Sequence, residues 1–451
     1  MKHTRPVVLT IAGSDSGGGA GIQADLKTIT VHGCFGVSAL TALTAQNTTG
    51  VQGIYPVPPA FIRQQLTSLF DDFDIKAAKT GMLHSPDIVR LVADTLRAHP
   101  GLKVVCDPVM VAKSGDKLLQ DDAISTLKTE LLPLSTVVTP NIPEAEILCG
   151  HPIQSDSDKE AACRAIHALG THGVLLKGGH ETGDFSTDLF FDGETFHPFA
   201  TPRYPTPNTH GTGCTTSAAI AANLALGKHL VKAVADAKVY MDTAIRFSLS
   251  LGHGHGPTDH FASVEQGAEK FKVLQTLSEA VEYFCNHPAG PLIPEVQTNI
   301  AYALPGARSH GEIAAVPGRI VSLKGFPHAS GCPAFGASRH IANIVLTVLR
   351  FSPAHRSVMN IRYEPTFLEN AEKLGFEIQS FDRHAEPLEV KDKEGSTLEW
   401  GTQTVLSRMH TIPDIIYDTG DVGKEPMIRV LGKTPLEVVT KALKTGGIDP
   451  R

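Results

Sequence analysis

A glycine-rich stretch at residues 206–217 carries the residue types best suited to chemistry. It reads Thr-Pro-Asn-Thr-His-Gly-Thr-Gly-Cys-Thr-Thr-Ser and leads into an apolar, alanine-rich run. Gly211 and Gly213 permit a tight turn, and a hydroxyl residue among 215–217 can cap the helix that the run predicts. Because backbone N–H groups at a helix start carry partial positive charge, Gly211, Thr212 and Gly213 are predicted to form an anion hole for a phosphate.

Cys214 belongs to the same stretch. A thiol at the positive end of a helix loses its proton more easily than in bulk water, so we predict that Cys214 can accept a proton. These few residues fit a buried cysteine in a glycine turn equally well, and on their own they leave both interpretations open. A second glycine-rich turn near the N-terminus favours the chemical interpretation.

This second turn spans residues 13–21 and reads Gly-Ser-Asp-Ser-Gly-Gly-Gly-Ala-Gly. It follows an apolar run of strand length at 7–12 and precedes a helical pattern at 22–29, an arrangement that places ligands at the carboxyl end of a parallel sheet. The stretch also contains the dinucleotide pattern G-x-G-x-x-A, but no acidic residue lies between Asp25 and Asp71 to bind a ribose. No G-x-x-x-x-G-K-[ST] occurs either. Dinucleotide-binding and P-loop classes are therefore excluded.

Strand and helix patterns then alternate, which predicts an α/β fold with a mainly parallel sheet covered by helices on both faces. Strand patterns at 74–82, 103–110, 136–144 and 172–180 deliver polar side chains just beyond their ends, namely Asp107, Asn141, Glu144 and Lys177. We expect these side chains to lie along one edge of the sheet. A hairpin is predicted at 184–199 with Asp192 and Gly193 as its turn, and a helix at 231–249 closes the unit.

Length and composition set the broad class. A chain of 451 residues predicts roughly two or three domains, and 41% apolar with 19% charged residues is typical of a soluble globular protein. The formal charge of -7 argues against nucleic acid or an anionic membrane as a partner. Seven scattered cysteines without a C-x-x-C spacing indicate reduced thiols, and no apolar run is long enough to span a bilayer. We expect a cytoplasmic protein.

Three histidines lie in the glycine loop 252–261. Their spacing is irregular and no carboxylate pair accompanies them, so an ordinary surface loop is favoured over a metal site. We predict a first domain at 1–262, an amphipathic linker helix at 263–287 and a second, smaller α/β domain at 288–451.

The second half gathers arginines and histidines among turns rich in glycine and proline. Ser338, Arg339 and His340 lie near the start of a predicted helix, where an anion would be stabilised. Residues 417–426 form another polar glycine loop, which holds Lys424. Taken singly, each arginine fits a solvated surface charge better than a phosphate ligand, and their clustering around glycine turns is the argument for phosphate binding.

The first half resembles the bacterial and archaeal hydroxymethylpyrimidine/phosphomethylpyrimidine kinases of thiamine biosynthesis. The resemblance covers about residues 5–262 and is carried by the motifs at 12–25, 44–47, 79–82, 107–110, 139–144 and 210–214. It implies a ribokinase-like fold, with the aminopyrimidine held by Gly13, Asp25, Gln46, Met82 and Val109. It also implies that Cys214 takes the place of the aspartate base of the wider superfamily, and that Glu144, together with Asp107, organises Mg²⁺.

These residue types suit phosphoryl transfer, which needs in-line positioning and neutralisation of charge on the moving group. Mg²⁺, Lys177 and the helix-start amides would supply that charge. Gln46 can both donate to and accept from an aminopyrimidine edge, and Met82 can pack on its ring. Without the glycine loops, Asp107 and Glu144 would be interpreted as turn or helix-capping carboxylates.

Residues 288–445 resemble the thiamine-phosphate synthase domain that replaces the barrel-type synthase in some organisms and is often fused behind this kinase. The motifs at 317–319, 330–340 and 418–426 carry the resemblance. It implies that the essential arginine and histidine of that family are Arg319 and His340. Because departure of pyrophosphate needs positive charge more than a base, both would stabilise the leaving group, with Ser338, Arg339 and Lys424 as phosphate contacts.

Together the two resemblances imply a bifunctional enzyme. It would phosphorylate hydroxymethylpyrimidine twice with ATP and Mg²⁺ and then condense the diphosphate with thiazole phosphate to thiamine phosphate. A kinase whose second domain only senses thiamine phosphate is a competing hypothesis, although Arg319 and His340 and the lack of a helix-turn-helix segment favour the enzyme. A pyridoxal kinase is a further hypothesis, and a protein-binding scaffold is a remote one. We expect small-molecule substrates and a homo-oligomer, with no nucleic-acid or membrane partner.

Overall fold

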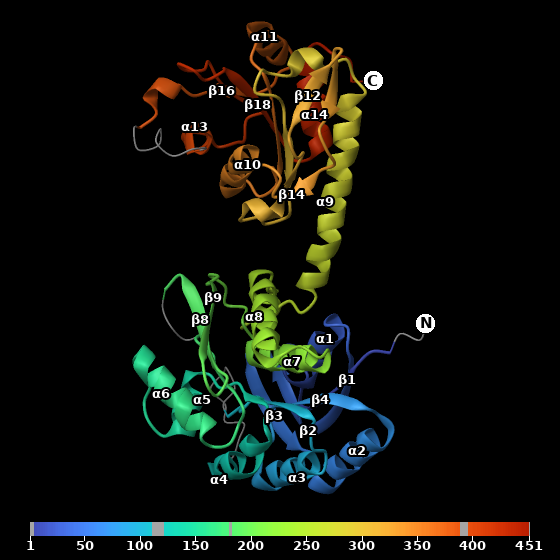
Figure 1. The fold of residues 1–451 in the computed structure, drawn as a ribbon, viewed down its shortest axis with the longest axis vertical. Coiled ribbons are helices and arrows are strands. Elements are labelled where there is room, and N and C mark those ends of the chain that lie inside the picture. Colours follow the sequence, from blue (N-terminus) through green and yellow to red (C-terminus); the bar gives the residue numbers. More distant parts are fainter. Residues whose placement is uncertain (1–3, 111–120, 180–182, 388–395, 451) are drawn as a thin grey trace. The chain divides into compact units, whose positions relative to one another are not determined.

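The computed structural model describes residues 4–110, 121–179, 183–387 and 396–450. It divides into two compact units, Met1–Val264 and Glu265–Arg451, and each is a separate body (Figure 1). Among the described helices, none combines the length and the apolar character needed to cross a membrane.

Within the described part of the first unit, nine strands form one mixed sheet in the order β3-β2-β1-β4-β5-β6-β7-β8-β9. Neighbouring strands from β2 to β7 pair in parallel, and antiparallel pairing brings β3 to one edge and β8 and β9 to the other. The strands are β1 (Val7–Asp15), β2 (Phe35–Asn47), β3 (Gly50–Pro56), β4 (Ile75–Thr80), β5 (Lys103–Cys106), β6 (Val137–Val138), β7 (Val174–Leu176), β8 (Phe185–Phe191) and β9 (Phe196–Pro202). The predicted mainly parallel sheet is confirmed, and so is the hairpin at its edge.

Helices cover both faces of this sheet, because successive side chains of a strand point to opposite faces. On β1, Leu9 and Ile11 pack in the same core as helices α2 to α6, whereas Val8 packs in the core of α1, α7 and α8. Figure 1 shows these layers around the sheet. The helices are α1 (Gly21–Val31), α2 (Pro59–Asp72), α3 (Pro86–Arg97), α4 (Asp121–Thr126), α5 (Ile142–Cys149), α6 (Asp156–His167), α7 (Thr212–Ala225) and α8 (Leu230–Arg246).

Helix α7 begins earlier than the sequence pattern predicts. Its N-cap is Gly211, with φ of 81°, and no side chain caps the helix. The hydroxyl residues 215–217, predicted as caps, lie inside the helix and are buried. That prediction was wrong because the left-handed backbone at Gly211 already turns the chain into the helix, and glycine adopts this conformation without steric cost.

In the second unit, the described strands form a seven-stranded sheet in the order β14-β11-β10-β15-β18-β17-β16 and a separate β12-β13 hairpin. Among these described strands, only β16 and β17 pair in parallel. The strands are β10 (Ile300–Ala303), β11 (Ile313–Ala315), β12 (Ile320–Leu323), β13 (Phe326–Ala329), β14 (Ala334–Phe335), β15 (Ser357–Arg362), β16 (Ile378–Ser380), β17 (Ile415–Asp418) and β18 (Met427–Gly432), and the helices are α9 (Ala262–Cys285), α10 (Arg339–Phe351), α11 (Pro365–Lys373), α13 (Ser396–Leu406) and α14 (Pro435–Thr445).

Helix α9 covers the segment interpreted as a linker. Leu277, Ala280 and Phe284 of this helix have no exposed surface and pack in the core of the second unit. Because an apolar face of α9 is used in that core, the helix is an integral part of the second unit.

Candidate active site

A cavity of about 950 Å³ lies at the carboxyl ends of the parallel strands of the first unit. It is lined by eleven of the twelve residues proposed for this unit, namely Gly13, Gln46, Met82, Asp107, Val109, Glu144, Lys177, Gly211, Thr212, Gly213 and Cys214. Parallel strands end at the same edge of a sheet, so residues that follow successive strands meet there. Asp25 differs from the other eleven because it does not line the cavity.

The two glycine-rich turns meet in this cavity. A Cβ atom on Gly211 would lie 1.8 Å from the carbonyl oxygen of Gly19, so only glycine allows the two backbones to approach this closely. Gly213 lies in the first turn of α7, where an added Cβ would be 3.4 Å from Lys177 Nζ. The first-turn amides of α7 have no partner inside the helix and stand beside this lysine, which suits a phosphate group.

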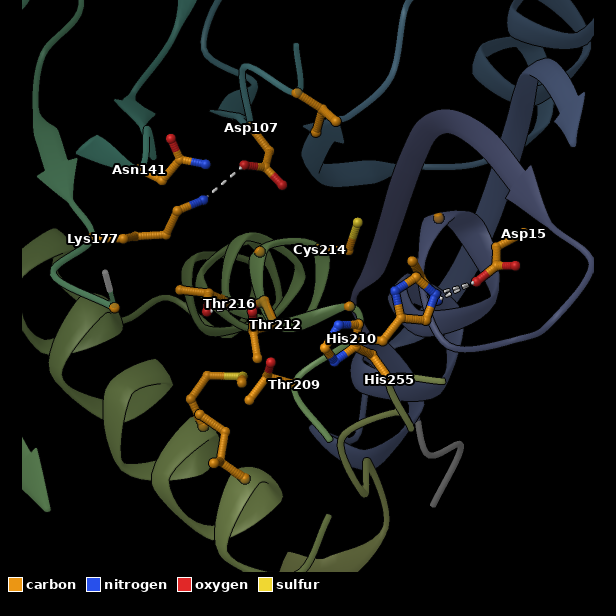
Figure 2. Close-up of a pocket in the computed structure, with 18 of the residues that line it drawn as sticks. Asp15, Asp107, Asn141, Lys177, Thr209, His210, Thr212, Cys214, Thr216 and His255 are labelled. Atoms are coloured by element: carbon orange, nitrogen blue, oxygen red, sulfur yellow. Dashed lines mark hydrogen bonds and ion pairs between the residues drawn. The ribbon is translucent and has the colours of Figure 1, made fainter. Parts of the chain in front are cut away.

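Asp15 organises the N-terminal turn. Its carboxylate accepts hydrogen bonds from the amides of Gly17 (2.8 Å), Gly19 (3.1 Å) and Ala20 (2.8 Å). His210 Nε2 lies 2.9 Å from Asp15 Oδ2 and thereby joins this turn to the one before α7 (Figure 2). Burial opposes ionisation of Asp15, but the hydrogen bonds from His210 and the amides outweigh it and hold the pKa of this carboxyl below its usual value.

Lys177, Asp107 and Glu144 form a charged group on one wall. Lys177 Nζ lies 3.2 Å from Asp107 Oδ1, and Figure 2 shows the two side chains pointing toward each other. Glu144 Oε2 accepts the amide of Asn141 in a capping box, so the capping interpretation of this carboxylate also holds. Burial, with the charge of Asp107 adding to it, raises the pKa of Glu144 to about 7 against the influence of Lys177.

The two carboxylates fit Mg²⁺ in its usual protein environment. Mg²⁺ is bound by one or two carboxylates together with water and substrate phosphates. Glu144 is buried and its raised pKa signals a site where a cation would relieve the cost of a negative charge. Among the described residues, no group of three or more His, Cys, Asp and Glu side chains is placed to hold a metal by itself. A cation here would therefore need water or phosphate oxygens to complete its shell.

Cys214 projects from the start of α7 into the same space (Figure 2). We expected its thiol to lose a proton easily at a helix start, but burial raises its pKa to about 11, and the charges of Asp25 and Asp107 add to this effect. The charge of Lys79 and a hydrogen bond from the Gly21 amide act in the opposite direction. The expectation was wrong because burial of the sulfur outweighs the positive end of the helix.

Asp25 is fully buried and is not among the described residues that line the cavity. Lys79 Nζ lies 3.1 and 2.9 Å from its two carboxylate oxygens, and Thr10 Oγ1 donates to Oδ2 at 2.6 Å. Its carboxylate oxygens serve Lys79 and Thr10, and Lys79 lines the cavity. The contact of Asp25 with a pyrimidine stays a prediction.

Asp15, Lys79 and His210 are among the residues that line the cavity without having received a role from the sequence. Each lies inside a motif that carried the family resemblance, and this position in a motif was the sequence feature that could have identified it as a site residue. The histidine loop 252–261 was interpreted as an ordinary surface loop. His255 is exposed, as expected of a surface loop, and it also lines the cavity, with its amide donating to the carbonyl of Thr48. His260 departs from the expectation because it is buried.

In the second unit, Arg319 lies beside the glycine loop 418–426. Its guanidinium donates to the carbonyl of Val296. The carboxylate of Glu425, in that loop, accepts a hydrogen bond from the Val296 amide at 3.0 Å. Arg319 has φ of 93°, a left-handed conformation that is costly for an arginine. The backbone at Arg319 is therefore strained, and its side chain is anchored by the hydrogen bond to Val296.

Ser338, Arg339 and His340 follow a segment that bonds to the amino end of β11, whereas Arg319 follows its carboxyl end. Ser338 is the N-cap of α10, and Arg339 and His340 begin the helix with exposed side chains. Gly336, just before the helix, donates to Ile313 at the amino end of β11, whereas Arg319 follows the carboxyl end of that strand. The fold thus brings Arg319 to the 418–426 loop and puts the start of α10 at the other end of a short strand.

Lys424 belongs to that loop and is partly exposed. Its Nζ lies 3.8 Å from Oε2 of Glu386, a buried carboxylate. Beneath the loop, Asp418 accepts from Arg383 at 2.6 Å and pairs with Arg429 at 2.7 Å, and all three side chains are buried. Two buried guanidinium groups on one carboxylate leave net positive charge under the loop, which suits an anionic ligand.

Comparison with known proteins agrees with the two-unit organisation. The family model described as phosphomethylpyrimidine kinase matches residues 15–259, and the model described as thiamine-phosphate synthase ThiN matches residues 276–444. The chain is 53% identical over 261 residues to the thiamine biosynthesis bifunctional protein ThiED of Geobacter sulfurreducens, a match that covers 58% of this chain and about half, 53%, of that protein.

A hydroxymethylpyrimidine/phosphomethylpyrimidine kinase of Haemophilus influenzae is 50% identical over 260 residues, 56% of this chain and 96% of that protein. The fold of the first unit is similar to the Bacillus subtilis pyridoxal kinase in its ADP complex, with a TM-score of 0.55 and 40% identity over 58% of this chain and 99% of that one. The first unit therefore has the ribokinase-like fold, and the chain belongs to the phosphomethylpyrimidine kinase family and carries a second unit of the thiamine-phosphate synthase ThiN type.

Proposed function

We propose that this protein is a bifunctional enzyme of thiamine biosynthesis. Its first unit transfers phosphate from ATP to 4-amino-5-hydroxymethyl-2-methylpyrimidine and then to the resulting monophosphate. Its second unit joins the diphosphate to hydroxyethylthiazole phosphate and releases pyrophosphate. The observation that carries the first activity is one cavity that combines a thiol, a charged Lys177–Asp107 pair and an uncapped helix start.

In this mechanism the substrate hydroxyl oxygen attacks the γ-phosphorus of ATP as the bond to the ADP oxygen breaks. The sulfur of Cys214 accepts the hydroxyl proton. The amides at residues 212–214 and the ammonium of Lys177 stabilise the charge on the phosphoryl oxygens. Asp107 and Glu144 would hold Mg²⁺, which when bound neutralises the charge of the nucleotide phosphates.

Gln46, Met82 and Val109 line the cavity and are proposed to hold the pyrimidine. Thr44 Oγ1 donates to Gln46 Oε1 at 3.1 Å and orients this amide, whose nitrogen lies 3.4 Å from His210 Nε2. Gly13 allows close approach on the same side, because a Cβ there would lie 2.6 Å from the end of the Met82 side chain. The pocket therefore has an apolar face and one polar edge.

A pyridoxal kinase is the second candidate function. The solved structures of pyridoxal kinases from Bacillus subtilis and Staphylococcus aureus are 36–40% identical to this chain over the first unit. The curated kinases of the pyrimidine are more similar, at 46–50% identity for those from Bacillus subtilis and Haemophilus influenzae. Both substrates are aza-aromatic alcohols, so a direct comparison of turnover separates them.

The test uses the full chain with ATP, Mg²⁺ and either alcohol, and follows ADP release and product mass. The proposal predicts both the mono- and diphosphate of the pyrimidine and a higher kcat/KM than for pyridoxal. Cys214→Ala should reduce phosphorylation at least about 100-fold while binding of the pyrimidine, measured by calorimetry, stays within about threefold. Retained turnover would remove Cys214 from the reaction, and a preference for pyridoxal would favour the second candidate.

The synthase proposal is tested with the full-length Cys214→Ala variant, hydroxymethylpyrimidine diphosphate and thiazole phosphate. Thiamine phosphate should form, because the two units are compact bodies with separate cores. Arg319→Ala and His340→Ala should each lower this rate strongly without changing the first unit's binding of the pyrimidine. If thiamine phosphate binds to the second unit but no product forms, that unit senses thiamine phosphate and does not make it.

A further inference from the structure

Lys79 is a fully buried lysine beside the proposed reaction centre. It belongs to β4, and with Arg429 it is one of the two largest side chains of the described chain that are fully buried. Its ammonium lies within 3.1 Å of both carboxylate oxygens of Asp25, which is itself fully buried in α1. Placing a charged pair in a protein interior is costly, so its presence under a cavity calls for a role.

The surrounding backbone leaves space for the ammonium. A Cβ atom on Gly81 would lie 2.8 Å from Lys79 Nζ and 3.0 Å from Ala12 Cβ, so glycine at this position allows the lysine its place. Thr10 donates to Asp25 from the neighbouring strand β1. The pair is thus fixed from β1, β4 and α1.

Cys214, the proposed proton acceptor, is the side chain on which the charges of this pair would act. Helix α7 packs on β4, and both Cys214 and Lys79 line the cavity. Charged groups act on the sulfur from each packed element: Lys79 from β4, Lys177 after β7, Asp25 from α1 and Asp107 after β5. The amide of Gly21 at the start of α1 donates to the sulfur as well.

Of these charges, Lys79 acts most strongly on the thiol and favours its thiolate form. Lys79 itself stays protonated, because the neighbouring carboxylates, Asp25 first, overcome the effect of burial on its pKa. A lysine held charged in this way cannot accept the substrate proton. It can stabilise a negative sulfur.

We propose that Lys79, held by Asp25, is the buried counter-ion of the Cys214 thiolate and positions its charge for proton transfer from the substrate. The inference rests on the proposed role of Cys214 as base. In the step itself, the thiolate takes the hydroxyl proton and becomes a thiol, the hydroxyl oxygen bonds to the γ-phosphorus, and the departing ADP oxygen keeps the electron pair of the broken bond. Lys79 loses no proton at any stage.

The test measures the thiolate directly, through the rate of Cys214 alkylation by iodoacetamide between pH 6 and 10, followed by mass spectrometry of the peptide that contains it. Lys79→Met should slow alkylation at pH 8 about tenfold, since raising the pKa of the thiol by one unit lowers the thiolate fraction tenfold. A purely structural role for Lys79 would loosen the site and expose the sulfur, which would speed alkylation. Slower alkylation is therefore the signature of electrostatic control.

Faster or unchanged alkylation in a folded Lys79→Met variant would overturn the proposal. If a single variant does not fold, as judged by circular dichroism, the Lys79→Met/Asp25→Asn double variant removes both charges and leaves neither unpaired. It should alkylate more slowly than the wild type, because Lys79 acts on the sulfur more strongly than Asp25. An unchanged rate in a folded double variant would also overturn the proposal.

This readout is independent of kinase turnover. If Cys214→Ala keeps its activity, the proposed base is wrong, yet the alkylation profile still reports the coupling between Lys79 and the sulfur. If Cys214→Ala is inactive and Lys79→Met leaves the alkylation profile unchanged, the base stands and the counter-ion does not. Cys163, buried beside other helices and away from the cavity lining, is the internal control whose alkylation should not change in any variant.

Discussion

His260 is a buried histidine at the end of the first unit, with Nε2 3.0 Å from Thr215 Oγ1 of α7. Burial, with help from the charge of Lys27, lowers its pKa to about 4. The unfolded chain, with an ordinary histidine pKa near 6.5, therefore binds a proton in the range between pH 6.5 and 4 that the folded chain does not. Stability should fall as pH drops through this window.

Between about pH 7 and pH 5 this single residue should lower the free energy of unfolding by about 2 kcal/mol. His260→Gln keeps a partner for Thr215 and removes the titration, so this variant should lose about 2 kcal/mol less over the same range. Hydrogen exchange of the α7 amides reports the stability of the first unit and measures the difference. Equal pH dependence in both proteins would show that His260 is solvated.

Asp418 in the second unit is a buried carboxylate that serves two buried arginines, Arg383 and Arg429. Asp418→Asn would leave both guanidinium groups without a counter-charge and should destabilise the second unit by about 3–5 kcal/mol. The exposed pair of Arg350 and Glu399 provides a control, and Glu399→Gln should cost less than about 1 kcal/mol.

Unfolding in urea, followed by fluorescence of the single tryptophan, measures both variants, because this tryptophan packs at the core of the second unit. Similar losses for the buried and the exposed substitution would mean that the arginine pair finds other partners.

At the scale of elements, the close approach of the two glycine turns is the feature most sensitive to substitution. Gly211 and Gly227 flank α7 with almost the same φ, 81° and 82°, but only Gly211 has backbone where a Cβ would go. Gly227→Ala should cost about 1–2 kcal/mol, because alanine is strained in a left-handed conformation. Gly211→Ala has that cost and must also separate the turns, so kinase activity should fall at least about 100-fold.

Steady-state phosphorylation and thermal unfolding of the two variants separate these effects. Loss of activity in Gly227→Ala to the same extent would indicate that the left-handed backbone, and not the contact with Gly19, is what matters.

At the scale of the whole molecule, the fold assigns α9 to the second unit. A fragment of residues 262–451 should fold and melt cooperatively. A fragment of residues 288–451 lacks α9 and should show no cooperative transition, because Leu277 and Phe284 would leave a large hole in its core. Tryptophan fluorescence during heating compares them, and a cooperative melt of the shorter fragment at an unchanged temperature would contradict this assignment.

Residue types and their order in the sequence determined much of this protein. Apolar runs followed by polar exits were enough to predict a mainly parallel sheet and to gather Asp107, Glu144 and Lys177 at one edge, because the strands of a parallel sheet end together. Glycine at 211 and 213 and the motif before α7 located the predicted anion-binding turn, because glycine marks positions where the backbone must turn or approach closely. These signals depend on residues close together in the sequence or on the period of apolar residues, so they do not depend on tertiary contacts.

Tertiary structure alone decided the rest. Burial raises the pKa of Cys214, whose thiol was expected to lose its proton easily. The fold also pairs Asp25 with Lys79, a residue 54 positions away. The same packing makes α9 part of the second core. Charge and exposure depend on neighbours that are distant in sequence, so no local pattern carries them and only the folded chain shows which residues must share a low-dielectric interior.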